Sequence, residues 1–187
     1  MTLCDLKQKG TKIVAIGATA SEKYLINKHV EATCLLVVQH IKNVMKFQNE
    51  INRPLGFHSR LMERMFHPED ILILKGTSKQ LYTNPYSKSR KEHIVPMNYL
   101  LNELWRLIEE QRHTDEMLAI ILKNHLGVAY ITHEEAQKLD SKISGLKANM
   151  PTGWRLGIDD PLERLQAVDI VLLDEHGQEV HTLRMAS

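Results

Sequence analysis

One long run of helical periodicity near the N-terminus constrains the fold of this chain more than any other feature. From Ser21 to about Ile51, apolar residues recur at intervals of three and four, which is the spacing of one face of an α-helix. Ser21 can act as the N-cap, and Pro54 and Gly56 interrupt the pattern. The centre, Ala32 to Val38, is apolar almost all round, so we expect it to be buried between other elements or in the interface of a homodimer.

The rest of the chain mixes shorter helical and strand patterns. Helices are expected at His58–Phe66, Met97–Arg112, Thr114 to near Gly127, Thr132 to about Leu139, and Pro161–Ala167. Strands are expected at Ile71–Gly76, Glu92–Pro96 and Val128–Ile131, with a β-hairpin around His176-Gly177. Thr11–Gly17 is either a further short strand or an ordered lead-in. These patterns predict an α+β fold with a helical N-terminal region, residues 1–76, and an α+β region, residues 77–187, which can together form one compact domain.

The balance of charges and the cysteine content exclude several classes of protein. The 24 basic and 23 acidic residues give a net charge of +1, so attraction to nucleic acid has to come from a local patch. Cys4 and Cys34 are the only cysteines, too few for a disulfide framework or a cysteine-built zinc site. A reducing, cytoplasmic setting is expected. We expect neither secretion nor a membrane span, because the sequence shows no apolar leader and no long uncharged apolar run.

A basic segment without a single acidic residue runs from Thr77 to Lys91. It interleaves four cations with two aromatic rings, and its candidate nucleic-acid-binding residues are Lys79, Tyr82, Tyr86, Lys88, Arg90 and Lys91. Lysines can neutralise phosphates, and tyrosine rings can stack on bases. The alternative is that the segment is ordinary solvated surface, which is the usual place for a lysine-rich loop.

Four polar residues, the first of them directly after this segment, form a candidate catalytic pattern. Glu92 and His93 stand together on an expected strand, Asn124 precedes the next strand, and His133 follows Asn124 at the ninth position, opening a helix. An imidazole near neutral pKa can activate a water for attack on a phosphodiester. A cation held by a carboxylate and a second imidazole can offset the charge that develops on the phosphate.

This pattern, an acid-His-Ile-x-Pro strand followed by Asn and His, resembles the HNH nuclease family over about residues 90–139. The resemblance implies a ββα-metal core and an endonuclease that hydrolyses DNA phosphodiesters, in a bacterial or phage setting. It also implies that His93 is the general base, that Glu92 and His133 bind one divalent cation, Mg²⁺ or Mn²⁺, and that Asn124 orients the motif. The predicted partner is DNA.

Another interpretation needs no catalysis. Successive side chains of a regular strand point to opposite faces, so Glu92 and His93 can share a pocket only if a bulge or an end distortion intervenes. Without one, these two residues are the polar end of a half-buried strand, and Asn124 is a residue at a helix C-terminus. His133 is then a first-turn residue beside a capping box formed by Thr132 and Glu135. The chain would be a non-catalytic α+β protein that binds a protein or nucleic-acid partner.

Overall fold

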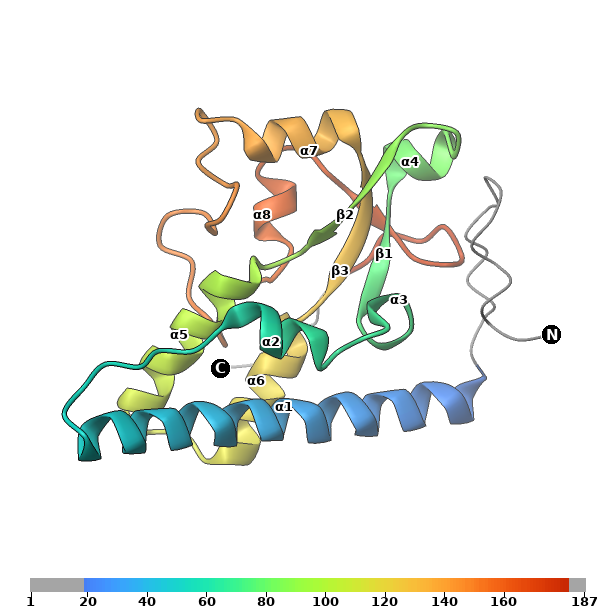
Figure 1. The fold of residues 1–187 in the computed structure, drawn as a ribbon. Coiled ribbons are helices and arrows are strands. Elements are labelled where there is room, and N and C mark those ends of the chain that lie inside the picture. Colours follow the sequence, from blue (N-terminus) through green and yellow to red (C-terminus); the bar gives the residue numbers. More distant parts are fainter. Residues whose placement is uncertain (1–18, 182–187) are drawn as a thin grey trace.

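The computed structural model describes residues 19–181, and its architecture is α+β, as the sequence patterns predict. The segment Thr11–Gly17, expected to be a strand or an ordered lead-in, lies outside the described residues. In chain order the elements are α1 (Ala20–Glu50), α2 (Ser59–Arg64), α3 (Glu69–Leu72), β1 (Leu74–Ser78), α4 (Lys79–Thr83), β2 (Ser89–His93), α5 (Met97–Glu109), α6 (Asp115–His125), β3 (Val128–Thr132), α7 (His133–Asp140), α8 (Glu163–Gln166) and β4 (Leu172–Leu173) (Figure 1).

The long N-terminal helix is confirmed, but its first turn is set by a different residue from the one expected. Thr19 is the N-cap: its Oγ1 accepts a hydrogen bond from the backbone N–H of Glu22 (3.2 Å), and the Glu22 carboxylate accepts one from the Thr19 N–H (2.7 Å). This reciprocal capping box satisfies two backbone donors at once, which a cap at Ser21 would not do. α1 therefore begins at Ala20.

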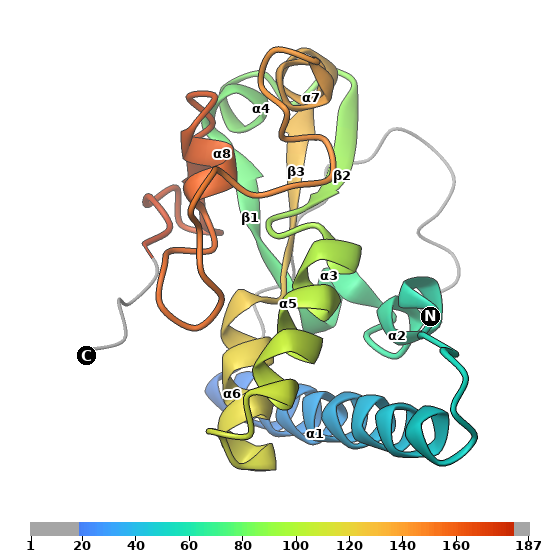
Figure 2. The ribbon, with the colours of Figure 1, turned by 90° about the vertical axis from the view of Figure 1, so that its left-hand side faces the viewer.

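The apolar centre of α1 is buried within the chain itself. Cys34, Val37, Val38 and Ile41 are fully buried, and α1 packs principally against α6. Figure 2 shows α1 running beneath α5 and α6. Of the two outcomes expected for this centre, burial between elements is the one observed.

A small mixed sheet with strand order β2-β3-β1-β4 organises the rest of the fold. β3 pairs antiparallel with β2 and parallel with β1, and β4 pairs antiparallel with β1. The two faces of this sheet are covered by different short helices. In Figure 2, α8 lies on one side of the strands and α2 and α3 lie on the other.

The hydrophobic core is continuous across the boundary at residue 76 that the sequence suggested. One cluster of buried side chains joins Val30 and Ile41 of α1 to Leu104 of α5, Leu122 of α6 and Leu172 of β4. The helical N-terminal region and the α+β region thus share a single core.

Three segments fold differently from the sequence prediction. The strand expected at Glu92–Pro96 lies three residues earlier, since β2 spans Ser89–His93 and Pro96 is the N-cap of α5. The strand expected at Ile71–Gly76 is displaced: residues 69–72 form α3, Ile71 is half exposed, and β1 begins only at Leu74. Pro68 and two acidic residues at the start of α3 favour a helical turn there. The basic segment expected to be a loop begins with the last two residues of β1 and continues as α4, because Ser78 Oγ accepts a hydrogen bond from the N–H of Leu81 (3.2 Å) and caps that helix.

The C-terminal hairpin is present but short. Leu173 pairs with Glu179, the Val180 N–H donates to the Leu172 carbonyl (2.9 Å), and Gly177 lies in the turn with φ of 77°. Within residues 19–181, none of the helices combines the length and the apolar character needed to cross a membrane.

Candidate functional site

The strand β2 divides the HNH-like residues between the two faces of the sheet. Its pairing with β3 is regular from Ser89 opposite Thr132 to His93 opposite Val128. Arg90 and Glu92 therefore point toward α7 and α8, while His93 points toward α2 and α3. The strand distortion that would let Glu92 and His93 face one pocket is not present in this pairing.

On the α8 face, the Glu92 carboxylate is neutralised by two guanidinium groups. Arg164 Nη2 lies 2.9 Å from Glu92 Oε1, and Arg90 Nη2 lies 3.0 Å from Glu92 Oε2. Arg90 also binds Asp140 at the end of α7 (2.5 Å), and this hydrogen bond lowers the pKa of the Asp140 carboxyl. A divalent cation at Glu92 would have to enter beside two positive charges, so this carboxylate does not fit the predicted role of metal ligand.

Arg164 has no exposed side-chain surface, and its guanidinium group links three segments. Besides Glu92, it donates hydrogen bonds to the carbonyl oxygens of Leu146 (2.8 Å), Lys147 (3.1 Å) and His93 (2.7 Å). A buried cation with this many acceptors is an architectural element that holds residues 146–147 and α8 against the end of β2.

On the opposite face, His93 lies near two carboxylates. Within residues 19–181 a single group of three or more His, Cys, Asp or Glu side chains could hold a metal ion: Glu63 of α2, Glu69 of α3 and His93. One ligand atom from each of the three lies within 4.8 Å of the others. His93 Nε2 is 4.0 Å from Glu63 Oε1, beyond hydrogen-bonding distance, and although this nitrogen is buried no described residue hydrogen-bonds to it.

Further charged groups extend this cluster. Lys91 Nζ binds Glu69 Oε2 (2.5 Å) and lies 3.6 Å from Asp70. Burial would lower the pKa of Lys91, but the hydrogen bond to Glu69 and the charge of Asp70 raise it overall. The Tyr130 hydroxyl donates to Asp70 (2.9 Å), and burial, followed by this bond, raises the pKa of Tyr130 to about 12.

The structure does not bring His133 to the cluster around His93. His133 follows Thr132, which pairs with Ser89 at the other end of β2, four residues or about 13 Å from His93 along the strand. His133 is exposed, and its backbone N–H donates to the carbonyl of Lys88 (3.0 Å). Asn124, half-buried in the last turn of α6, lies at the His93 end. The proposed metal pair of Glu92 and His133 is therefore not assembled: the two residues lie at different positions along the sheet.

The candidate nucleic-acid-binding residues separate into free and engaged groups. Arg90 and Lys91 are held in the ion pairs described above. Lys79 and Lys88 are exposed, and neither has an ion pair with another described residue. The Tyr82 ring lies against the backbone at Gly177, whereas the Tyr86 ring is 94% exposed. We name the basic stretch of residues 77–91 the Lys/Tyr segment; its free groups are Lys79, Tyr86 and Lys88.

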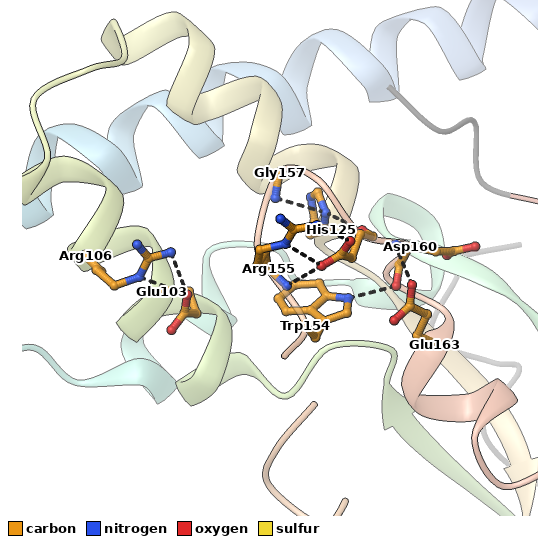
Figure 3. A network of polar contacts seen from close by, with 9 residues as sticks. Glu103, Arg106, His125, Trp154, Arg155, Gly157, Asp160 and Glu163 are labelled. Carbon is orange, nitrogen blue, oxygen red and sulfur yellow. Dashed lines mark hydrogen bonds and ion pairs between the residues drawn. The ribbon is translucent and has the colours of Figure 1, made fainter. Parts of the chain in front are cut away.

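A second polar cluster has a structural role (Figure 3). Trp154 is buried and its Nε1–H donates to the Asp160 carbonyl (2.9 Å), so the ring anchors the linker of residues 150–157. Its ring packs edge-on against His125, whose centroid is 5.6 Å away. His125 Nδ1 lies 2.8 Å from the Ile121 carbonyl, the Gly157 N–H faces Nε2 at 3.4 Å, and burial lowers the pKa of this imidazole. The contacts suit a neutral ring that fastens the linker to α6.

Three residues that matter most at these sites were not singled out from the sequence. Glu63 and Glu69 belong to two short helices, and Arg164 lies 72 residues beyond Glu92. For Glu69 a signal existed, since an acidic pair directly after Pro68 predicts a helix N-terminus. Glu63 and Arg164 carry no local pattern that sets them apart.

No protein-family model, no curated protein and no solved structure matches this chain.

Proposed function

We propose that the chain is a non-catalytic protein that binds single-stranded nucleic acid through the free groups of the Lys/Tyr segment. The observation that carries this proposal is the exposure of Tyr86: 94% of its side chain is in solvent, at a turn between Asn84-Pro85 and Lys88. A ring so exposed contributes little to packing, but it is available to stack on a base.

The groups around Tyr86 suit a phosphate backbone. Lys88 follows it at the start of β2, Lys79 begins α4, and His133 at the start of α7 is joined to Lys88 through its backbone. Two free ammonium groups predict weak, salt-dependent binding. The slope of log K against log salt should be roughly −1.4, because each neutralised phosphate of a single strand contributes about −0.7.

Fluorescence anisotropy with a labelled single-stranded oligonucleotide tests this proposal. Tyr86→Ala should weaken binding by about 1–3 kcal/mol, the range for one lost stacking contact. Lys88→Gln should reduce the salt slope by about 0.7. Tyr24→Ala is the matched control, since Tyr24 is also a largely exposed tyrosine but lies on α1. Equal binding by Tyr86→Ala and the wild-type protein would exclude the proposal.

A metal-dependent endonuclease is the second candidate, favoured by the placement of His93 beside two carboxylates. Such an enzyme would use Glu63, Glu69 and His93, whereas the HNH pattern implies Glu92 and His133 as the metal ligands. Nicking of plasmid DNA in Mg²⁺ or Mn²⁺ should disappear in His93→Ala and persist in His133→Ala. If the wild-type protein cuts no DNA with either ion, this candidate is excluded.

We also propose a homodimer formed through the outer face of α1. Leu25, Leu36 and Phe47 are 62%, 56% and 53% exposed and recur every 11 residues, close to three full turns, so they form a nearly straight apolar stripe. The stripe is separate from the buried face of α1: at about 100° per residue, Leu36 lies roughly 100° around the helix from Val37 and roughly 140° from Ile41. Light scattering after size exclusion should give twice the chain mass, and Leu36→Glu should restore the mass of one chain.

A further inference from the structure

We propose that Glu63, Glu69 and His93 form a binding site for a divalent first-row transition metal such as Zn²⁺ or Mn²⁺. This site differs from the one that the HNH pattern implies, with which it shares no metal ligand. It also lies at the far end of β2 from Tyr86, so neither proposal depends on the other.

Three potential ligands from three separate elements converge at this site. Glu63 comes from α2, Glu69 from the first turn of α3 and His93 from the last position of β2. Their ligand atoms lie within 4.8 Å of one another. Ligand atoms about 2.1 Å from a tetrahedral ion are about 3.4 Å apart, so only a small contraction is required. Glu63 can supply it by a side-chain rotation, because a third of its side chain is in solvent.

The His93 imidazole has a buried nitrogen that is available to a metal ion. Its Nε2 is buried and lies 4.0 Å from Glu63 Oε1, yet it has no hydrogen-bond partner within residues 19–181. A buried polar atom without a partner is uncommon, and a bound ion or water is a usual explanation. A metal ion between His93 and Glu63 would coordinate this nitrogen directly.

The local charge at this face of the sheet favours a bound cation. Glu63, Glu69 and Asp70 bring three negative charges to this face, and Lys91 brings one positive charge. Among these four groups two negative charges remain uncompensated, which matches a dication. Lys91 engages Oε2 of Glu69, and the second oxygen of that carboxylate remains for a metal.

The ligand types favour particular ions. One imidazole with two carboxylates suits Zn²⁺, Mn²⁺ or Fe²⁺, whereas Mg²⁺ and Ca²⁺ prefer sites made of oxygen alone. Three protein ligands also leave at least one coordination position for water. Binding would join α2 and α3 to β2 and so stabilise the face of the sheet that these short helices cover.

Isothermal titration of the metal-free protein with ZnCl₂, MnCl₂ and MgCl₂ tests the site. The wild-type protein should bind one Zn²⁺ or Mn²⁺, and Mg²⁺ more weakly. Glu63→Gln, Glu69→Gln and His93→Gln should each weaken Zn²⁺ binding at least about tenfold. The matched controls, Glu103→Gln on α5 and His133→Gln on α7, should bind as the wild-type protein does.

A second measurement is independent of any variant. Saturating Zn²⁺ at about 100 times the Kd should raise the Tm of the wild-type protein by roughly 5–10 °C, because the ion binds only the folded state. The proposal is overturned if the wild-type protein binds no Zn²⁺ or Mn²⁺ at millimolar concentration. It is equally overturned if the three ligand variants keep wild-type affinity, or if His133→Gln loses binding to the same extent as they do.

Discussion

Replacing Arg164 by Met should destabilise the fold by several kcal/mol. The change removes a fully buried guanidinium that is 2.9 Å from the Glu92 carboxylate and that donates to three carbonyl oxygens. Removing one partner of a buried ion pair typically costs about 3–5 kcal/mol. Here Glu92 would keep only the more exposed Arg90, and three buried carbonyl oxygens would lose their donor. For a chain of this length each kcal/mol lowers the Tm by about 2–4 °C, so the expected fall is on the order of 10 °C.

Chemical denaturation with urea measures the effect directly. The midpoint should fall in Arg164→Met without a change in the slope of free energy against urea concentration. Adding Glu92→Gln to Arg164→Met should recover part of the loss, since the second change removes a largely buried carboxylate whose charge only Arg90 still offsets. The interaction energy from this double-mutant cycle is expected to be about 1–3 kcal/mol.

The control is Arg155→Met, which breaks an ion pair with Asp159 on the surface. Exposed pairs contribute about 0–1 kcal/mol, so this variant should remain close to the wild-type protein. If Arg164→Met is no less stable than Arg155→Met, the assignment of Arg164 as the counter-ion that holds Glu92 is wrong.

Three other perturbations test separate parts of the structure. Gly76→Ala should destabilise the protein by about 1–3 kcal/mol in urea denaturation, because its Cβ would lie 2.4 Å from the backbone oxygen of Leu173 on β4. Thr132→Ala should cost about 1–2 kcal/mol in the same assay, because it removes the N-cap of α7, and an unchanged midpoint would refute that role. The pKa of His125 is lowered by burial, so the unfolded chain takes up a proton near pH 6.5 whereas the folded protein takes it up only at a lower pH. Stability should therefore fall as the pH drops below 6.5, and His125→Gln should show a smaller fall in pH-dependent thermal denaturation.

The long and strongly patterned elements are those that the sequence predicts well. α1, α5 and α6 follow apolar stripes that repeat every three or four residues, and the capping box of Thr132 and Glu135 is found as expected at the start of α7. These features depend on residues that are close in sequence, so local physical rules determine them. β1 was misplaced by three residues because Ile71 looks like part of an apolar strand although it lies on the short helix α3.

The composition of the site could not be predicted in the same way. Strand alternation correctly indicates that Glu92 and His93 face apart, yet the groups that each of them meets come from elsewhere in the chain. His93 meets Glu63 from α2, while Glu92 meets Arg164 from α8, which lies 72 residues away. Such contacts depend on how the short helices pack on the sheet, and no sequence spacing encodes that packing.

β2 directs His93 toward the carboxylates of Glu63 and Glu69, away from Glu92 and His133. The ¹⁵N chemical shifts of the histidine rings, followed by NMR during a Zn²⁺ titration, measure this arrangement. A ring nitrogen resonance of His93 should shift to that of a metal-bound imidazole while the ring resonances of His133 stay unchanged. A metal-induced shift at His133, or none at His93, would show that the metal site is wrongly placed.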